Sequence, residues 1–178
     1  MHYGLGDYVL DIAQNAVEAV PREVILDLDE SEDRFRVSVR DDGRGMTAEE
    51  KARALDPFYT DGTKHAGRKV GLGLPFLAQA VELAGGRWAI ESEKGKGTKV
   101  EFAFPSASVD SPPAGEIPSL LLGLLCLPGD HEMLIRRKSP RGSYELRRSE
   151  LSEAVGGLER ASSLALLRDY LASMEDDD

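Results

Sequence analysis

The segment 69–76, which reads Lys-Val-Gly-Leu-Gly-Leu-Pro-Phe, places Gly71 and Gly73 at the start of an apolar stretch. A helix N-terminus has unpaired backbone N–H groups and the positive end of the helix dipole, and it therefore attracts phosphate. Glycine allows the backbone to approach such an anion closely. A glycine-rich turn also precedes many helices for packing alone, so this segment by itself is weak support for a phosphate site.

Other polar residues in the chain have a spacing that suits a nucleotide site. Asp11 and Asn15 are four residues apart, so a helix would turn both side chains to one side. Asp41 ends a strand-like run before the glycines of 43–45, and a buried carboxylate there can accept a hydrogen bond from an amino group such as that of adenine. The amide oxygen of Asn15 is a hard ligand suited to Mg²⁺. Thr98 offers a hydroxyl to a base edge.

Helices and strands predicted from the hydrophobic pattern hold these residues. Apolar residues at helical spacing predict a helix over 4–20 that Pro21 ends, and clean alternation predicts a strand over 35–40. The other predicted elements are a strand at 24–28, a short helix at 47–55 with a capping box, a helix at 74–84, and a hairpin of 87–92 and 98–104. This order indicates the α+β class, with residues 1–105 forming a two-layer α/β sandwich.

A second region follows residues 106–116, whose prolines and small polar residues are typical of a linker. The pattern beyond it predicts an apolar helix at 117–127, a hairpin of 131–138 and 143–148, and a last helical stretch capped by Ser149 and divided at 156–157. We expect residues 117–178 to form a small αββα C-terminal appendage. Its leucine-rich helix either packs on the preceding domain or offers a docking or homodimer surface.

Composition limits the classes of partner. The 178 residues have a formal net charge of −10, which argues against nucleic acid or an anionic membrane as the main partner. The single cysteine, Cys126, excludes an intramolecular disulfide and fits a reducing cytoplasm, and its apolar neighbours predict a buried thiol. With no visible signal peptide and no apolar run long enough for a bilayer, we expect a cytoplasmic protein. His2, His65 and His131 show no metal-ligand spacing, and we expect them to be structural or solvent-facing.

Taken together, these motifs resemble the ATP-binding domain shared by gyrase, heat-shock chaperones, histidine kinases and mismatch-repair ATPases, known as the GHKL superfamily. The similarity covers residues 4–105 and implies the Bergerat-type ATP-binding fold. The matching positions are Asn15 in the N box, 41–45 in the first glycine box, 56–60 in the phenylalanine box of the lid, 71–74 in the second glycine box, and 97–98 in the last motif. The stretch 56–105 is most similar to the catalytic domain of bacterial sensor histidine kinases.

The resemblance implies that ATP and Mg²⁺ are the cofactors, with Asn15 as the ligand of Mg²⁺ and Asp41 as the residue that binds adenine. Other residues expected to contact the nucleotide are Gly43, Gly45, Met46, Lys64, Lys69, Gly71, Leu72, Gly73, Leu74 and Thr98. Two interpretations stay open for the basic lid residues Lys64 and Lys69, which are either γ-phosphate contacts or parts of a solvated loop.

The sequence departs from the family pattern in three places. Lys69 replaces the usual first glycine of the second glycine box. Asp11 stands where clamp ATPases and anti-sigma serine kinases have a glutamate general base, whereas histidine kinases generally have asparagine. A base at Asp11 would favour serine, threonine or water as the nucleophile, while a solvent-facing carboxylate is the other interpretation. The chain also begins close to the N box, without the helical hairpin that carries a phosphoacceptor histidine, so we expect no autophosphorylation in cis.

Three functions are therefore weighed. The first is a stand-alone protein kinase, acting on histidine or serine, that transfers the γ-phosphate to a separate partner protein in signalling. The second is a slow ATPase or an ATP-gated binding module, similar to an anti-sigma regulator, whose lid closes on the nucleotide. The third is a nucleotide sensor without turnover. Positioning and Mg²⁺ do most of the work of phosphoryl transfer, so the motifs alone do not separate these functions.

Overall fold

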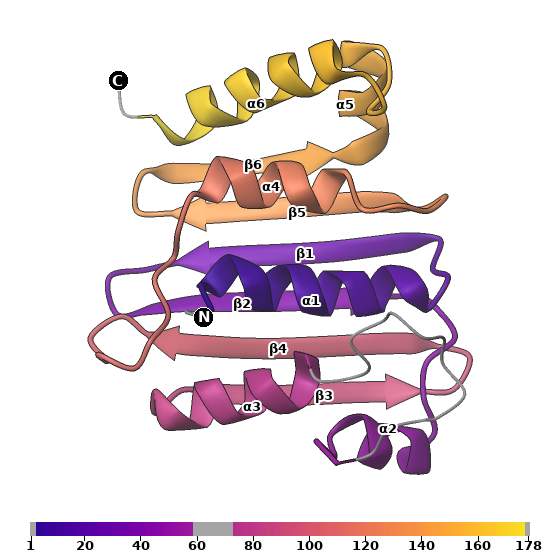
Figure 1. Cartoon of the computed structure of the whole chain (residues 1–178), viewed down its shortest axis with the longest axis vertical. Coiled ribbons are helices and arrows are strands. Elements are labelled where there is room, and N and C mark those ends of the chain that lie inside the picture. The colour runs from indigo at the N-terminus through magenta and orange to yellow at the C-terminus, as the bar shows by residue number, and fades with distance from the viewer. Residues whose placement is uncertain (1–2, 59–72, 177–178) are drawn as a thin grey trace.

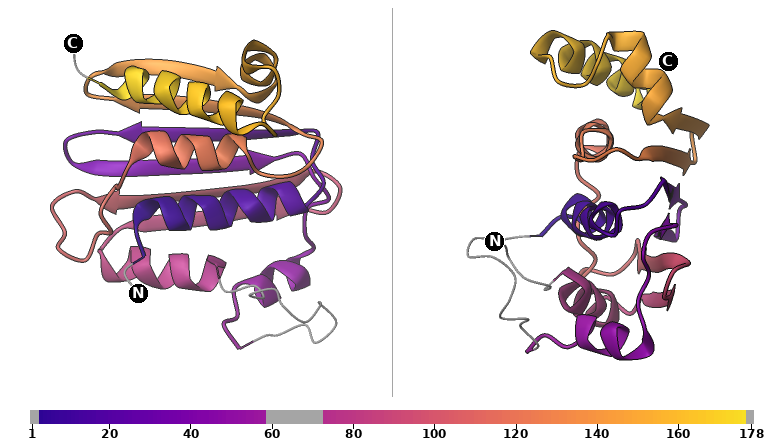
Figure 2. Two further views of the ribbon diagram at one scale, coloured as in Figure 1. Left: turned by 45° about the horizontal axis from the view of Figure 1, so that its top comes forward. Right: turned by 90° about the vertical axis from the view of Figure 1, so that its right-hand side faces the viewer.

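A six-stranded sheet and six helices make up the computed structural model, which describes residues 3–58 and 73–176. The strands are β1 (Glu23–Glu30), β2 (Arg34–Asp41), β3 (Arg87–Glu93), β4 (Gly97–Pro105), β5 (Glu132–Ser139) and β6 (Gly142–Arg147). The helices are α1 (Leu5–Glu18), α2 (Ala48–Ala54), α3 (Gly73–Leu83), α4 (Ile117–Leu125), α5 (Arg148–Val155) and α6 (Ala161–Glu175). The helices lie on one side of the sheet (Figures 1 and 2). The predicted two-layer α/β sandwich of the α+β class is confirmed.

Local sequence explains where the N-terminal elements begin and which faces they bury. The carboxylate of Asp7 accepts a hydrogen bond from the Gly4 N–H at 2.8 Å and satisfies one free donor at the start of α1. Thr47 and Glu50 form the predicted capping box of α2, with Thr47 Oγ1 accepting from the Glu50 N–H at 3.1 Å. One side of α1 is apolar and packs on the sheet; its buried residues are Leu5, Val9, Ile12, Ala13, Ala16 and Val17.

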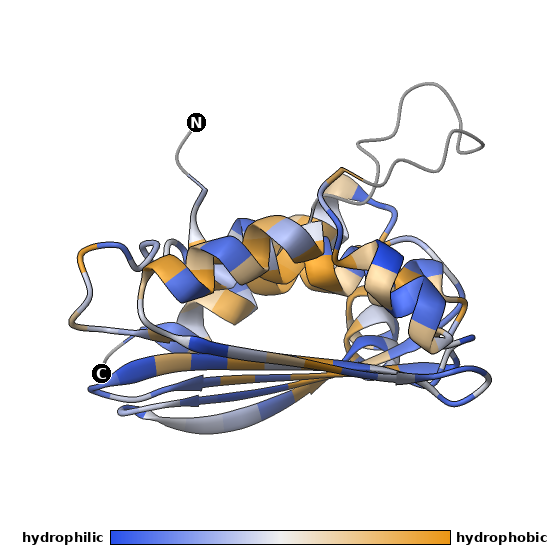
Figure 3. Cartoon of the chain, turned by 90° about the horizontal axis from the view of Figure 1, so that it is seen from below, coloured by the Kyte–Doolittle hydropathy of each residue, from blue (hydrophilic) through white to orange (hydrophobic). Residues whose placement is uncertain are grey.

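The sheet has the order β3-β4-β2-β1-β5-β6, and it is antiparallel except for the parallel pair β1 and β5. Asp41 and Thr98 are directly paired across β2 and β4. One face of the sheet carries the helices, and in the described ranges no helix covers the other face (Figure 3). That open face is charged, with Arg36 paired to Glu101 across strands at 3.0 Å.

The C-terminal residues continue this sheet. β5 pairs with β1 in parallel, with Ile135 beside Leu26, and β6 pairs with β5. α4 packs on α1 and α6, and its leucines 120, 121, 124 and 125 are buried in the common core. The region predicted as a C-terminal appendage therefore shares one sheet and one core with the N-terminal domain. β1 lies inside the sheet only because β5 covers its edge.

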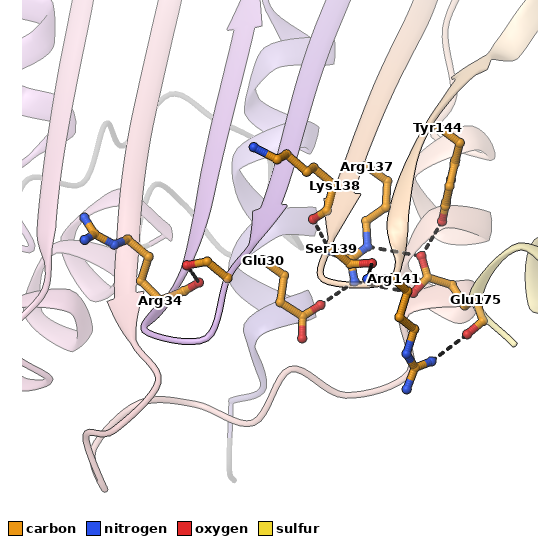
Figure 4. Close-up of polar contacts among 9 residues, drawn as sticks. Glu30, Arg34, Arg137, Lys138, Ser139, Arg141, Tyr144 and Glu175 are labelled. Atoms are coloured by element: carbon orange, nitrogen blue, oxygen red, sulfur yellow. Dashed lines mark hydrogen bonds and ion pairs between the residues drawn. The ribbon is translucent and has the colours of Figure 1, made fainter. Parts of the chain in front are cut away.

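A buried arginine ties α6 to the end of the sheet. The side chain of Arg137 on β5 is 2% exposed and forms ion pairs with Glu30 of β1 and Glu175 of α6. The hydroxyl of Tyr144 on β6 also donates to the Glu175 carboxylate (Figure 4). A buried arginine is held in a folded protein by such paired carboxylates, because an unpaired buried charge is costly.

Two predictions about side chains are wrong. Cys126 is exposed, because it follows α4 as the C-cap residue while the leucines take the inward side of that helix. Ser149 is not the N-cap of the next helix, which begins one residue earlier at Arg148. Glu132 occupies the place expected of the cap, since its carboxylate accepts hydrogen bonds from both the N–H and the hydroxyl of Ser149.

Within the described residues, no helix has the combination of length and apolar character that a membrane span requires.

Candidate functional site

A pocket of about 210 Å³ lies between α1, α3 and the adjoining ends of β2 and β4. It brings together predicted site residues that are far apart in the sequence, namely Asn15, Asp41, Gly45, Met46, Leu74 and Thr98. Small-molecule sites usually measure about 300–1,000 Å³, so the described walls suit a group of nucleobase size.

Asp41 is the last residue of β2 and is 6% exposed. Its Oδ1 accepts the Gly43 N–H at 2.9 Å, and the backbone N–H of Thr98 also donates to its carboxylate. Burial raises the pKa of Asp41, and the two backbone hydrogen bonds offset part of that rise. A partly desolvated carboxylate at the end of an apolar pocket is a strong acceptor for a ligand N–H group.

The wall beside Asp41 is organised around a serine on β3. Ser92 Oγ accepts the Met46 N–H at 2.8 Å and lies 2.8 Å from Thr98 Oγ1.

Two glycines allow the backbone segments around this wall to approach one another closely. A Cβ on Gly45, which has φ of +61°, would lie 1.9 Å from the Glu93 carbonyl oxygen. A Cβ on Gly97, with φ of +106°, would lie 2.0 Å from the Asp41 carbonyl oxygen.

Gly43 lies at the base of this wall, outside the residues that line the pocket. A Cβ on Gly43 would lie 2.5 Å from the Ala19 carbonyl oxygen and 2.9 Å from Asp41 Oδ1. The neighbouring Arg44 N–H donates to that same Ala19 oxygen at 3.0 Å. The loop after β2 is therefore held against the end of α1, and a side chain at residue 43 would separate them.

The start of α3 meets the polar side of α1. A Cβ on Gly73, the first residue of α3, would lie 3.4 Å from Asp11 Cβ and 3.9 Å from Asn15 Nδ2. Asp11 and Asn15 are both exposed, and Leu74 is buried beside them as part of the pocket wall. The positive end of the α3 dipole thus lies beside a carboxylate and an amide, which is an environment for a phosphate chain with its cation.

Four of the predicted nucleotide contacts, Lys64, Lys69, Gly71 and Leu72, lie outside the described residues, as do His2 and His65.

Sequence reasoning missed several residues of the pocket wall. These are Ile12, Ala16, Glu18, Ala19, Val39, Arg44, Ala54 and Val100. Spacing could have found most of them. Residues 12, 18 and 19 lie three or four positions from Asn15, on α1 and at its C-cap, and Ala16 is next to Asn15. Val39 and Val100 lie two positions from Asp41 and Thr98 on the same strand faces. No spacing relation links Ala54 to the rest, because it comes from α2.

This arrangement combines two environments. Apolar residues from α1, β2 and β4 line the pocket together with Asp41 and Thr98, and such a lining suits a flat heterocycle with a polar edge. The N-terminus of α3 beside Asn15 suits a negatively charged group. A ligand with an amino-substituted ring and a phosphate chain matches both.

Comparison with known proteins agrees with this chemistry. The family model described as "Histidine kinase-, DNA gyrase B-, and HSP90-like ATPase" matches residues 3–108. The sensor histidine kinase ZraS of Klebsiella oxytoca is 38% identical over 104 residues, which are 57% of this chain and 22% of that protein. Sporulation kinase C of Bacillus subtilis is 33% identical over 101 residues, which are 56% of this chain and 23% of the kinase. The chain thus spans about a fifth of the length of these relatives.

Among solved structures, the N-terminal domain of a DNA repair protein aligns with a TM-score of 0.55 at 12% identity. The alignment covers 90% of this chain and 58% of that one, and at this identity it shows a likeness of fold alone.

Proposed function

Because the chain belongs to the family of histidine kinase-, DNA gyrase B- and HSP90-like ATPases, we propose that it binds ATP with Mg²⁺ and transfers the γ-phosphate to a separate partner protein. The resemblance stated from the motifs is thereby confirmed at the level of the family. The observation that carries the proposal is the pocket whose lining combines buried Asp41 and half-buried Thr98 with apolar residues.

The pocket fits the adenine base of ATP. The Asp41 carboxylate would accept the exocyclic amino group, since it is buried and lines the pocket. Val39 and Val100 would contact the ring, because both lie on the strand faces that line the same pocket. These contacts bind and orient the base, and they leave the phosphate chain to the α1–α3 side of the site.

The α1–α3 side fits phosphate and Mg²⁺. Mg²⁺ prefers oxygen ligands, usually keeps several waters, and neutralises phosphate charge when it is bound with a nucleotide. Asn15 would supply an amide oxygen to the ion, and the backbone at Gly73 would approach the phosphates closely because it carries no side chain. Lys64, Lys69, Gly71 and Leu72 remain predicted nucleotide contacts.

The one histidine among the described residues is not a suitable phosphoacceptor. His131 is 7% exposed, and both of its ring nitrogens are buried. A buried imidazole does not reach a γ-phosphate in the pocket without unfolding its surroundings. His131 is therefore not the proposed acceptor. We propose as acceptor a histidine or serine of a separate protein, in a cytoplasmic signalling reaction.

The second candidate function is a slow ATPase or an ATP-gated binding module. The position of Asp11 beside the first residue of α3 favours it, because a carboxylate there can take a proton from an attacking water. The same carboxylate would serve a serine or threonine acceptor in a kinase.

Incubation of the full chain with γ-labelled ATP, Mg²⁺ and the proteins encoded by neighbouring genes tests these functions. Label on a partner protein is the expected result. Free phosphate without protein labelling supports the ATPase, and binding without turnover supports a nucleotide sensor. The Asp41→Asn variant is the control, because at ATP concentrations below saturation it should strongly reduce label transfer while the protein stays folded.

Homodimerisation through residues 117–178 is a further part of the proposal. Leu166 and Tyr170, one turn apart on α6, are 62% and 46% exposed and offer an apolar contact surface. Removal of the whole region is unsuitable as a test, because α4 and β5 belong to the common core. Sedimentation of the full chain and of a Leu166→Glu/Tyr170→Glu variant tests it, and a wild-type monomer would overturn it.

A further inference from the structure

Ser92 lies beside the pocket and connects two residues of its wall. It is half-buried on β3, one of the two edge strands of the sheet, and is directly paired with Thr98 on β4. Thr98 and Met46 both line the pocket, whereas Ser92 itself stands one layer behind them. Ser92 is not one of the predicted site residues, and its role follows from its hydrogen bonds.

Contacts within the protein use most of the hydrogen-bonding capacity of the Ser92 hydroxyl. A hydroxyl has one proton to donate and can accept two hydrogen bonds. Ser92 Oγ accepts from the Met46 N–H at 2.8 Å, which leaves its proton for one of two acceptors. These are Thr98 Oγ1 at 2.8 Å and the Gly97 carbonyl oxygen at 3.2 Å. The shorter contact is the one to Thr98.

The choice between these acceptors decides what Thr98 presents to a ligand. If Ser92 donates to Gly97, Thr98 spends its own proton on Ser92 and presents only lone pairs to the pocket. If Ser92 donates to Thr98, the Thr98 proton is available to the ligand. Because Met46 N–H already donates to Ser92, the second arrangement forms a continuous chain of donors from the backbone into the pocket.

We propose that Ser92 is a positioning residue that determines base specificity, by donating to Thr98 and so making the Thr98 hydroxyl a hydrogen-bond donor in the pocket. The inference rests on the proposed function. Asp41 then supplies an acceptor and Thr98 a donor, side by side across β2 and β4. A 6-aminopurine presents the complementary pair, an amino N–H and an unprotonated ring nitrogen. A 6-oxopurine presents an oxygen and a ring N–H, and it mismatches both groups.

The test is the affinity of the full chain for three nucleotides, measured by calorimetry: ATP, GTP, and 1-deaza-ATP, in which C–H replaces that ring nitrogen. Wild type should bind ATP about tenfold more tightly than 1-deaza-ATP, the ratio expected for one lost hydrogen bond. Ser92→Ala removes the group that orients the Thr98 hydroxyl, which can then rotate away from the ring nitrogen; it should weaken ATP by up to about tenfold, change 1-deaza-ATP less than twofold, and lower the preference for ATP over GTP. Ser92→Thr, which keeps the hydroxyl, should restore the preference.

The outcomes separate this inference from the proposed function. Equal weakening of ATP and 1-deaza-ATP by Ser92→Ala would mean that Ser92 only supports the loop at Met46, and it would overturn the inference. Wild-type binding of both nucleotides with equal affinity would also overturn it, and this result needs no variant to fold. Failure of wild type to bind ATP at all would overturn the proposed function as well. Ser143→Ala, on the exposed edge strand β6 at the far side of the sheet, is the matched control and should change no affinity.

Discussion

The guanidinium of Arg137 on β5 donates to the carboxylate of Glu175 on α6, with 3.1 Å between Nε and Oε1. Glu175 is the last residue of α6, and its side chain is 14% exposed. The pair is therefore a largely desolvated link between the C-terminal helix and the sheet. Glu30 on β1 is the second carboxylate paired with Arg137, so one buried guanidinium joins β1, β5 and α6.

Arg137→Met should lower the free energy of unfolding by about 3 kcal/mol, because it leaves two carboxylates without their buried cation. Arg136→Met is the matched control on the same strand. Its side chain is 46% exposed and pairs with Asp27 on the open sheet face, so its loss should cost less than about 1 kcal/mol. Urea unfolding of both variants measures the difference. Equal destabilisation by the two substitutions would contradict the assigned role of Arg137.

The sequence allowed the elements of the N-terminal half to be predicted, because their patterns are local. Alternation marked β2, helical spacing marked α1, and the capping box at Thr47 marked α2. Pairing across the sheet could not be predicted in the same way. Leucines in α4 indicate a buried helix without naming what it packs on, and nothing local in β5 specifies the parallel pairing with β1 that joins the C-terminal region to the sheet.

The candidate site shows the same division. Asp41 and Thr98 could be picked out by their residue types and motifs, but their direct pairing depends on the sheet order. Ser92 could not be predicted from the sequence, because its proposed role depends on one cross-strand hydroxyl contact. Cys126 was misjudged because its apolar neighbours say nothing about the direction of a C-cap side chain.

The Asp41→Asn substitution should weaken ATP binding without lowering the stability of the fold at pH 7. It should weaken ATP about 10- to 100-fold, since it removes a charged hydrogen-bond acceptor. Burial raises the pKa of Asp41, so in acid the folded state keeps this proton at pH values where the unfolded state has lost it. Stability therefore falls as pH rises through the unfolded pKa toward the folded one, and the cost of the buried charge is complete once the pH exceeds the folded pKa.

The asparagine variant avoids that cost, and at pH 7 it should be at least as stable as wild type. Its advantage should shrink toward pH 3, where Asp41 is protonated in both states. Calorimetric titration with ATP and thermal unfolding at the two pH values measure both effects. ATP affinity equal to that of wild type would show that Asp41 does not bind the nucleotide.

His131 should make stability sensitive to mild acid. Burial lowers the pKa of His131, and the nearby Arg148 adds to the effect, while Glu132 and Asp130 oppose it. The unfolded state then binds a proton below about pH 6.5 that the folded state resists, so stability is complete above that value and falls below it.

His131→Leu should remove this dependence. Neither ring nitrogen has a hydrogen-bond partner among the described residues, so the substitution breaks no such bond of the ring and should not destabilise the protein at pH 8. Urea unfolding at intervals from pH 8 to pH 5 compares the two proteins. A constant difference across this range would show that His131 titrates alike in both states.

Asp11→Asn tests the general base at the start of α3. If Asp11 takes a proton from the attacking nucleophile, the variant should lose turnover about 100-fold or more and keep its affinity for ATP within twofold. Asp27→Asn, at a half-buried carboxylate on the open face of the sheet, is the control and should change neither. Labelled-phosphate release or transfer reports turnover, and calorimetry reports affinity. Unchanged turnover in Asp11→Asn would end the general-base hypothesis and leave Asp11 as a solvent-facing carboxylate.

Val20 holds a strained conformation at the end of α1. Its φ is +56°, and it is the one non-glycine residue with positive φ in the ranges 3–58 and 73–176. A β-branched side chain is poorly tolerated there, and at 82% exposure Val20 gains little from burial in return. Val20→Asn should raise the free energy of unfolding by about 1 kcal/mol, since asparagine adopts this conformation more readily. Val20→Ile keeps the β-branch and should change stability by less than about 0.5 kcal/mol. If urea unfolding finds no gain for asparagine over isoleucine, the strain is compensated by contacts of the valine side chain itself.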